Sequence, residues 1–501
     1  MSDIGIVPHR RVITASVMLA MFVQTLDSTI CIVALPYIQG SMSASADEIS
    51  WVLTSYVIAA AIMTAPVGWM AQRFGRKRMF LICLVGFLCM SMLSGAARTL
   101  HQLIICRTIQ GMFGAALAPM CQATMLDMYP FAQRAQAMAI FALGITMGPV
   151  MGPTLGGYLT EAFNWRFVFY VTLAPGSLAL LGVIFFLPKI PPKPALTFSW
   201  YGFSMLATAV GTFQLMLDRG QTQDWFTSRE IMIEATIAGL CFYLFVVHMF
   251  TADKPFLPPA LFKDRNFFSG IIMVSCVSSV MLSTASLMAP FLQQLGHYPV
   301  QESGMAMAPR GFGTMVAVFV ASRLGMRFDQ RLIMATGLLS LGWSMLIMSG
   351  WTPDVTRTEM MGVLFMQGFS IGLVFNPMTV MAYTTLSPAL RPEATAVQSL
   401  ARNLGSAIGI SVTTFTLSRG TQTTHADLVT GLTPFDRVLQ AGDIASRMLN
   451  PATHKGAALL DQMVTFHARV ISYNNDFRLM TLSVIPPLIL LLFMRRHTRP
   501  G

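Results

Sequence analysis

The chain has 501 residues, of which 54% are hydrophobic and 11% are charged, and its formal net charge is +11. Because soluble globular domains carry about a quarter charged residues, this composition excludes an ordinary soluble domain and favours a membrane protein. The basic residues lie mainly between apolar runs and on one predicted side, so they indicate membrane orientation and no nucleic-acid partner is expected.

Apolar runs of membrane-spanning length recur along the whole chain, since about 20 such residues form a helix that crosses a bilayer. We place 14 spans, at 12–35, 50–70, 79–97, 101–124, 136–159, 166–187, 199–217, 231–250, 268–292, 302–322, 331–349, 358–384, 395–417 and 477–494. The sequence therefore predicts an all-α polytopic membrane protein. The positive-inside rule puts both termini in the cytoplasm.

The spans group as six, two and six. We expect an N-terminal six-helix bundle over 1–190, a Pro-rich linker with two central spans over 191–267, and a C-terminal six-helix bundle over 268–501. Two six-helix halves around a cavity near the middle of the membrane are typical of transporters.

The first span contains Asp27, the acid placed most deeply in an apolar run. A charged carboxylate at the middle of the bilayer costs at least about 3 kcal/mol, so such a residue usually faces a cavity and functions there. Two interpretations stay open. Asp27 is a proton-responsive group and counter-charge for cationic substrates, or a structural acid paired permanently with a neighbouring donor.

The fourth span contains Arg107 and Gln110, which share one helix face because they are three residues apart. Arg107 either takes part in proton coupling or extends its cation to water at the membrane surface. The second half adds two intramembrane arginines, Arg310 and Arg402, the latter beside Asn403. Intramembrane arginines need carboxylate, carbonyl or water partners, so this pair shapes the charge of a cavity, binds lipid head groups or locks helices together.

The fifth span carries a glycine ladder, in which Gly144, Gly148, Gly152 and Gly156 recur every fourth residue and Gly157 follows. Such a stripe lets a neighbouring helix approach closely in a membrane. Pro149 and Pro153 each remove a backbone donor and soften the helix. The ladder is therefore either a moving part or a tight structural crossing.

The longest polar stretch, 418–475, precedes the last span and is expected on the extracytoplasmic side. Its mixture of apolar and charged residues predicts one or two amphipathic helices, which either dock a partner or cap this protein alone. All seven cysteines fall in predicted spans and none forms a CxxC pair, so no metal site and no disulfide framework are expected.

The ordered motifs resemble the major facilitator superfamily over essentially the whole chain, within its group of fourteen-span drug:proton antiporters (DHA2). They are Leu26-Asp27-Ser28-Thr29-Ile30, the loop from Gly68 to Arg78, Arg107-Thr108-Ile109-Gln110-Gly111 and the glycine ladder. Leu217-Asp218-Arg219-Gly220, followed by Asp224-Trp225-Phe226, is similar to EmrB-type multidrug exporters. Two positions depart from the group: Gln72 stands where Asp is usual, and Ile32 where Asn is usual.

The resemblance implies roles for these positions. Arg107 would contribute to proton coupling, the ladder would be the antiporter motif, and the loop after the second span would restrain the cytoplasmic gate through Gly68, Gln72, Arg73, Gly75, Arg76, Lys77 and Arg78. Since Gln72 lacks a charge, it would weaken that restraint or reduce it to a hydrogen bond.

The expected function is export of hydrophobic or amphipathic toxic compounds in exchange for protons, with the proton gradient as energy source and no cofactor. The protein would lie in the inner membrane of a bacterium, in contact with lipids. A periplasmic membrane-fusion adaptor and an outer-membrane channel would carry the drug onward.

Other functions stay open. An alternative cargo is an anionic metabolite, fatty acid or bile salt, which Arg310 or Arg402 would suit. A non-transporting receptor or sensor would keep the fold without proton coupling. An intramembrane enzyme has little support, because the sequence contains no GxxxxGK[ST] or HExxH motif. Its GxSxG match, Gly368–Gly372, lies inside the predicted span 358–384, whereas a hydrolase nucleophile elbow is a turn between a strand and a helix.

Overall fold

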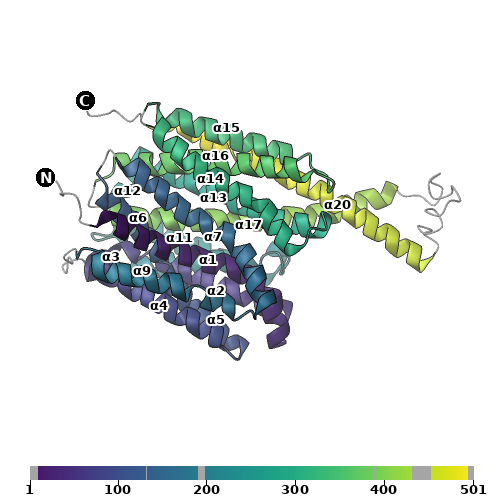
Figure 1. Ribbon diagram of the computed structural model, residues 1–501, viewed down its shortest axis with the longest axis horizontal. Helices are drawn as coiled ribbons and strands as arrows, with labels where there is room; N and C mark the ends of the chain where they lie inside the picture. Colours follow the sequence, from purple (N-terminus) through teal and green to yellow (C-terminus); the bar gives the residue numbers. More distant parts are fainter. Residues whose placement is uncertain are drawn as a thin grey trace.

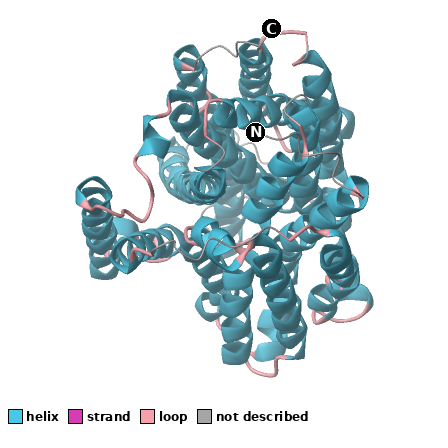
Figure 2. Cartoon of the chain, turned by 90° about the vertical axis from the view of Figure 1, so that its left-hand side faces the viewer, coloured by secondary structure: helices cyan, strands magenta, loops and turns pink. Residues whose placement is uncertain are grey.

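The computed structural model describes residues 9–130, 133–189, 198–325, 327–387, 390–431 and 453–494. These residues form helices joined by loops, with no strand among them (Figure 2). The all-α fold predicted from the sequence is confirmed. The longer helices of the first part are α1 (Arg10–Met42), α2 (Ala46–Thr64), α3 (Val67–Phe74), α4 (Arg76–Ala96), α5 (Leu100–Gly114), α6 (Leu117–Met128), α7 (Arg134–Ala162), the single turn α8 (Phe167–Tyr170) and α9 (Leu173–Phe186).

The remaining helices continue in the same manner. They are α10 (Trp200–Arg219), α11 (Arg229–Thr251), the short α12 (Ala260–Lys263), α13 (Arg265–Pro290), α14 (Val300–Leu324), α15 (Gln330–Met348), α16 (Arg357–Thr384), α17 (Arg391–Gly431), α20 (His454–Leu482) and α21 (Ile485–Phe493). A single 3₁₀ turn, η2 (Trp225–Thr227), precedes α11, and a π-helical turn, η3 (Phe291–Leu295), extends α13.

Ten helices of the described chain are long and apolar enough to cross a membrane. An eleventh span results if α2 and α3, which meet at an angle of 59°, are counted together. Pro66 lies at this bend and has no N–H to continue the helical hydrogen bonds. The predicted number of fourteen spans is therefore not confirmed. Three of the predicted spans correspond to α7, α10 and α17, which are helical but carry many Gly, Ser, Thr and Gln residues.

Two large clusters of buried apolar side chains organise the bundle. One gathers around α1, α4, α6, α7 and α9, and the other around α13, α15, α16 and α20. The first cluster continues into Tyr383, Val397 and Leu400 of α16 and α17, so the two halves pack together there. Between the halves in sequence, α10 packs against α11, α2 and α17. Residues 190–197, where the N-terminal bundle was expected to pass into the linker, lie outside the described residues.

The polar stretch 418–475 forms helix over its described parts. Helix α17 continues to Gly431, α20 begins at His454, and both extend beyond the bundle as an arm (Figure 1). A Cβ at Gly420 would lie 3.1 Å from the Ser472 hydroxyl, and His425 Nε2 lies 3.0 Å from Asp461 Oδ1. The amphipathic helices predicted for this stretch are therefore continuations of the helices on either side. Residues 432–452 lie outside the described residues.

Candidate functional site

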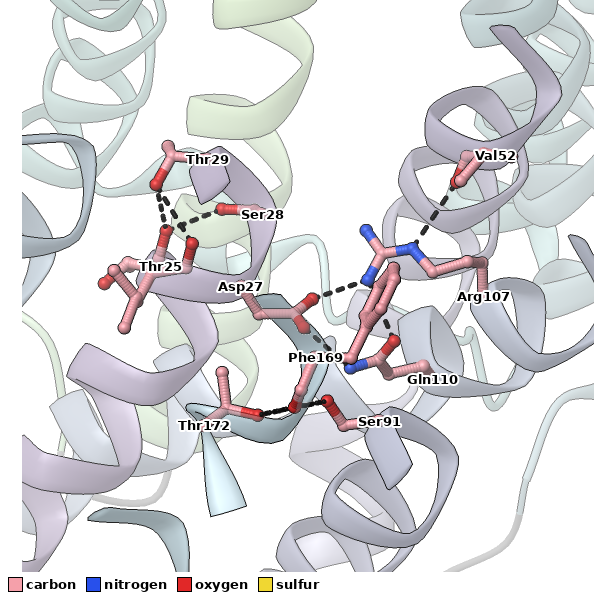
Figure 3. A network of polar contacts seen from close by, with 11 residues as sticks. Thr25, Asp27, Ser28, Thr29, Val52, Ser91, Arg107, Gln110, Phe169 and Thr172 are labelled. Atoms are coloured by element: carbon pink, nitrogen blue, oxygen red, sulfur yellow. Dashed lines mark hydrogen bonds and ion pairs between the residues drawn. The ribbon is translucent and has the colours of Figure 1, made fainter. Parts of the chain in front are cut away.

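Asp27, Arg107 and Gln110 form one buried polar cluster between α1 and α5 (Figure 3). Arg107 Nη1 donates to Asp27 Oδ2 at 2.6 Å and to Gln110 Oε1 at 2.8 Å. Gln110 Nε2 donates to the other carboxylate oxygen, Asp27 Oδ1, at 3.0 Å. All three side chains are 0% exposed. Each carboxylate oxygen therefore accepts a bond from a different donor.

Aromatic rings and one backbone carbonyl hold the Arg107 guanidinium in position. Its carbon lies 4.3 Å from the centre of the Tyr56 ring and 5.7 Å from that of Phe169. Arg107 Nε also donates to the Val52 carbonyl at 3.5 Å. The Ser91 hydroxyl donates to the Phe169 carbonyl at 2.9 Å and thereby fixes that residue (Figure 3). A cation over a desolvated aromatic face gains about 2 kcal/mol, so α2 and α8 help to stabilise the charge.

The arginine constrains what the aspartate can do. A guanidinium does not lose its proton in a protein, so protonation of Asp27 would leave a buried cation without a counter-charge. Removing one partner of a buried ion pair costs about 3–5 kcal/mol. Arg107 Nη2 is buried and has no hydrogen-bond partner among the described residues. Protonation of Asp27 would therefore require either that the Arg107 side chain moves or that another group supplies its counter-charge.

The glycine ladder of α7 packs against α1, the helix that carries Asp27. A Cβ at Gly148 would lie 2.3 Å from Thr25 Oγ1, and one at Gly152 would lie 2.2 Å from Thr29 Oγ1. The hydroxyls of Thr25 and Thr29 donate to the carbonyls of Gly144 and Gly148 at 3.3 and 3.1 Å. Gly156 lies against Ile30. The ladder spacing predicted a close approach of a second helix, and that helix is α1. The contacts with α7 lie both before and after Asp27 along α1.

The remaining ladder position, Gly157, is half-buried, and its carbonyl accepts a hydrogen bond from Thr160 Oγ1 at 2.9 Å. Pro149 and Pro153 lie within the continuous helix α7. The ladder thus runs through one unbroken helix.

The loop after the second span takes part in contacts between the two halves. Arg76 Nη1 lies 2.7 Å from Asp127 Oδ2, and Arg391 Nη1 at the start of α17 lies 3.7 Å from Asp127 Oδ1. Gln72 Nε2 donates to Glu393 Oε1, also on α17. We call Gln72, Arg76, Asp127, Arg391 and Glu393 the basic-end network. The uncharged Gln72 makes a hydrogen bond in this network.

The other loop residues support the turn itself. Gly75 has a φ of 86°, a conformation that residues with a Cβ rarely adopt, and it separates α3 from α4. Lys77 Nζ donates to the Ile184 carbonyl at 2.7 Å and ties the turn to α9. Gly68 is buried, Arg73 is half-buried and Arg78 is exposed. Among the described residues, none of these five forms a hydrogen bond or ion pair to the other half.

A second, uncharged contact joins the halves deeper in the bundle. Gln122 Nε2 on α6 donates to Gln398 Oε1 on α17 at 2.9 Å, and the Tyr383 hydroxyl on α16 donates to the same oxygen at 2.5 Å. All three side chains are buried. Both this contact and the basic-end network involve α17. This helix therefore supplies the C-terminal half's residues in both sets of cross-half bonds.

Arg310 and Arg402 are half-buried, and neither forms an ion pair with a carboxylate of the described residues. Arg310 Nη2 donates to the Met281 carbonyl at 2.5 Å. Arg402 Nη2 lies 3.5 Å from the Ser399 hydroxyl on its own helix. Asn403 is exposed and lies outside the Asp27 cluster. The C-terminal half therefore contributes two guanidiniums without a carboxylate partner in the described chain.

The family model of the Major Facilitator Superfamily matches residues 17–410. The chain belongs to the Major Facilitator Superfamily. It is accordingly an integral membrane protein of a transporter family rather than an enzyme. Among the described residues, no group of three or more His, Cys, Asp or Glu side chains is placed to hold a metal ion.

Relatives of known name are similar over nearly the full length. The multidrug export protein EmrB of Haemophilus influenzae is 30% identical over 96% of this chain and 95% of its own. The fatty acid resistance protein FarB of Neisseria gonorrhoeae is 28% identical over 93% of this chain and 92% of its own. The resemblance to EmrB-type exporters is therefore confirmed. The crystal structure of the human organic anion transporter MFSD10 covers 97% of this chain and all of its own, with a TM-score of 0.63 and 13% identity, and supports the superfamily fold.

Sequence analysis missed several residues of this superfamily member's polar network. Tyr56 and Phe169 gave no signal, because an aromatic residue in an apolar run is most often simple core. Glu393 and Gln398 lie 321 and 276 residues from their partners Gln72 and Gln122, so spacing could not pair them. Asp476 was hidden at the boundary between the polar stretch and the last predicted span, although it lies in the continuous helix α20 and is 1% exposed.

Proposed function

We propose that the protein is a proton-coupled secondary exporter of hydrophobic or amphipathic toxic compounds. The observation that carries this proposal is the fully buried cluster of Asp27, Arg107 and Gln110 on helices α1 and α5. The names of similar proteins, which refer to multidrug export and fatty acid resistance, support the cargo class. The same function places the protein in a bacterial inner membrane.

The energetics of this cluster support proton coupling. Protonation of Asp27 removes the counter-charge of Arg107, which favours a conformation that gives the guanidinium a new partner. One proton that crosses a potential of 100 mV contributes about 2.3 kcal/mol. This energy is of the same order as the cost of breaking a buried ion pair, about 3–5 kcal/mol. One or two protons are therefore enough to move the equilibrium between two conformations.

The ladder contact transmits this change to the rest of the protein. Thr25 and Thr29 bracket Asp27 on α1 and bond to the backbone of α7, which itself packs along α14 of the other half. A shift of α1 relative to α7 therefore changes the fit between the halves. In this scheme the basic-end network is the cytoplasmic gate, in its closed state, and both termini lie in the cytoplasm.

The experiment that tests the function is substrate flux in proteoliposomes under an imposed proton gradient. We expect fluorescent amphipathic drugs to move against their own gradient while protons move the other way. The flux should stop when a protonophore collapses the gradient. Drug binding without gradient-driven movement would instead favour a receptor or sensor on the same fold.

A second candidate cargo is an amphipathic anion, such as a fatty acid, a bile salt or an anionic metabolite. The two guanidiniums of Arg310 and Arg402 have no carboxylate partner in the described chain, whereas the Asp27–Arg107 pair is neutral as a whole. A carboxylate cargo would supply the missing counter-charge, and charge-assisted hydrogen bonds of this kind are the strong ones.

Neutralising these arginines is therefore expected to change cargo preference. Arg310→Gln and Arg402→Gln should lower flux of a carboxylate amphiphile by about tenfold, since a hydrogen bond to a charged group contributes about 1.5–3 kcal/mol. Flux of a cationic drug of similar size should stay level or rise. The measurement is the ratio of the two fluxes, with Arg469→Gln, an exposed arginine of α20, as control. Equal losses for both cargoes would contradict an anion-binding role.

The partners we propose are a periplasmic membrane-fusion adaptor and, through it, an outer-membrane channel. The arm formed by the ends of α17 and α20 extends beyond the bundle, and Leu428, Val429 and Met463 are exposed on it (Figure 1). Photocrosslinkers placed at Met463 should capture an adaptor in cells, whereas the same probe at lipid-exposed Leu492 should not. Capture from neither position would leave the protein working without an adaptor at this surface.

A further inference from the structure

A second acid is buried in the C-terminal half, far in sequence from the Asp27 cluster. Asp476 lies in α20 and is 1% exposed. The Thr416 hydroxyl of α17 donates to Asp476 Oδ1. Asp476 Oδ2 is buried and has no hydrogen-bond partner among the described residues. The side chain therefore has one neutral donor and an unsatisfied oxygen.

No cation compensates this carboxylate in the described part of the chain, because Asp476 takes part in none of its ion pairs. The titratable group beside it is Tyr473, one turn earlier on α20 and 3% exposed. Met480, one turn later, contacts the Thr284 hydroxyl of α13 through its sulfur, and that hydroxyl also faces Met345 of α15. The other elements around this turn of α20 thus contribute Thr416, Thr284 and thioethers. Arg469, one turn before Tyr473 on α20, is exposed and acts on Tyr473, but it forms no ion pair with Asp476.

An ionised carboxylate in such a place is unfavourable, because burial without a counter-charge costs several kcal/mol. A bound proton removes this cost and turns the unsatisfied oxygen into a hydroxyl. We propose that Asp476 is a second proton-binding carboxylate of this protein and that release of its proton favours a rearrangement of α20 against α17 in which water reaches the charged carboxylate. The step is a simple acid dissociation, in which the carboxyl O–H bond breaks and the proton passes to water.

Helix α17 connects this acid to the cross-half contacts. Arg391, Glu393 and Gln398 lie near one end of α17, and Thr416 lies 25 residues after Arg391, since 416 − 391 = 25. At 1.5 Å per residue the separation is about 37 Å, which exceeds the hydrocarbon core of a bilayer. Asp476 therefore lies towards the surface opposite the basic-end network, where the arm begins. A proton that Asp476 binds from the arm side of the membrane would bias the position of α17. This coupling rests on the antiport function proposed above.

Infrared difference spectroscopy of the purified protein across a pH series tests proton binding directly. Native protein should show the carbonyl band of a protonated carboxylic acid that disappears as the pH rises, and Asp476→Asn should lack this band. The matched control is Asp461→Asn, an exposed acid on the same helix, which should keep the band. Thr416→Val should move its disappearance to higher pH, because the lost hydroxyl is a donor that favours the charged form.

Flux in proteoliposomes then tests the coupling. Asp476→Asn should retain flux but lose its dependence on the pH of the arm side, while Asp461→Asn should retain that dependence. A band that is identical in native protein and Asp476→Asn would overturn proton binding at this residue. A missing band together with an unchanged pH profile of flux would overturn the coupling. Native protein without any gradient-driven flux would defeat the antiport function, and the infrared band would still decide whether Asp476 binds a proton.

Discussion

Asp27→Asn is expected to reduce gradient-driven export about 100-fold or more while leaving the protein folded. Asparagine has nearly the same shape as aspartate, so the α1–α7 contact is retained, but it has no charge to offset Arg107. An uncompensated buried guanidinium costs about 3–5 kcal/mol, and each 1.4 kcal/mol corresponds to a factor of ten. The measurement is drug flux in proteoliposomes under a proton gradient, compared with the native protein.

Two controls separate coupling from general damage. Exchange of labelled for unlabelled drug without a gradient should persist in Asp27→Asn, because it requires no net proton movement. The double variant Asp27→Asn with Arg107→Gln removes both charges, so it should regain thermal stability without regaining gradient-driven flux. Native rates of gradient-driven export in Asp27→Asn would move the proton site elsewhere, with Asp476 as the next residue to test.

The pairing at this site was largely predictable from the sequence, for a physical reason. An acid and a base inside apolar runs are stable only when paired or solvated, so Asp27, Arg107 and Gln110 were candidates before their contacts were known. Their geometry was not predictable. The aromatic rings of Tyr56 and Phe169, which lie over the guanidinium, come from two other helices and have no distinguishing local pattern.

The limits of sequence analysis also have physical causes. A glycine every fourth residue predicts a close neighbour but not which helix it is, and α1 was identified only by its contacts with the ladder. A polar stretch has the same composition whether it is a loop or a solvent-exposed helix, so the arm was assigned to a loop with short helices. This assignment put Asp476 outside the last span and concealed a buried acid.

The ladder supplies the second large effect, because Gly148 has no room for a side chain. A Cβ at this position would lie 2.3 Å from Thr25 Oγ1 and 2.5 Å from the Thr25 carbonyl carbon. Since one of these atoms belongs to the backbone, a rotamer change cannot relieve the overlap, and α1 must move away from α7. Overpacking of this kind costs about 1–3 kcal/mol.

Gly148→Ala is therefore expected to lower gradient-driven flux about tenfold or more and to lower Tm. The displaced segment of α1 carries Asp27 two residues after Thr25, so the ion pair with Arg107 should lengthen as well. Gly144→Ala is the matched control on the same helix face, because its added methyl group meets the mobile end of Met18 at 3.3 Å. Flux and Tm of that variant should stay close to native values. If both alanine variants behaved alike, the α1–α7 contact would be a tolerant packing surface, and movement at Asp27 would have to reach the other half by a different route.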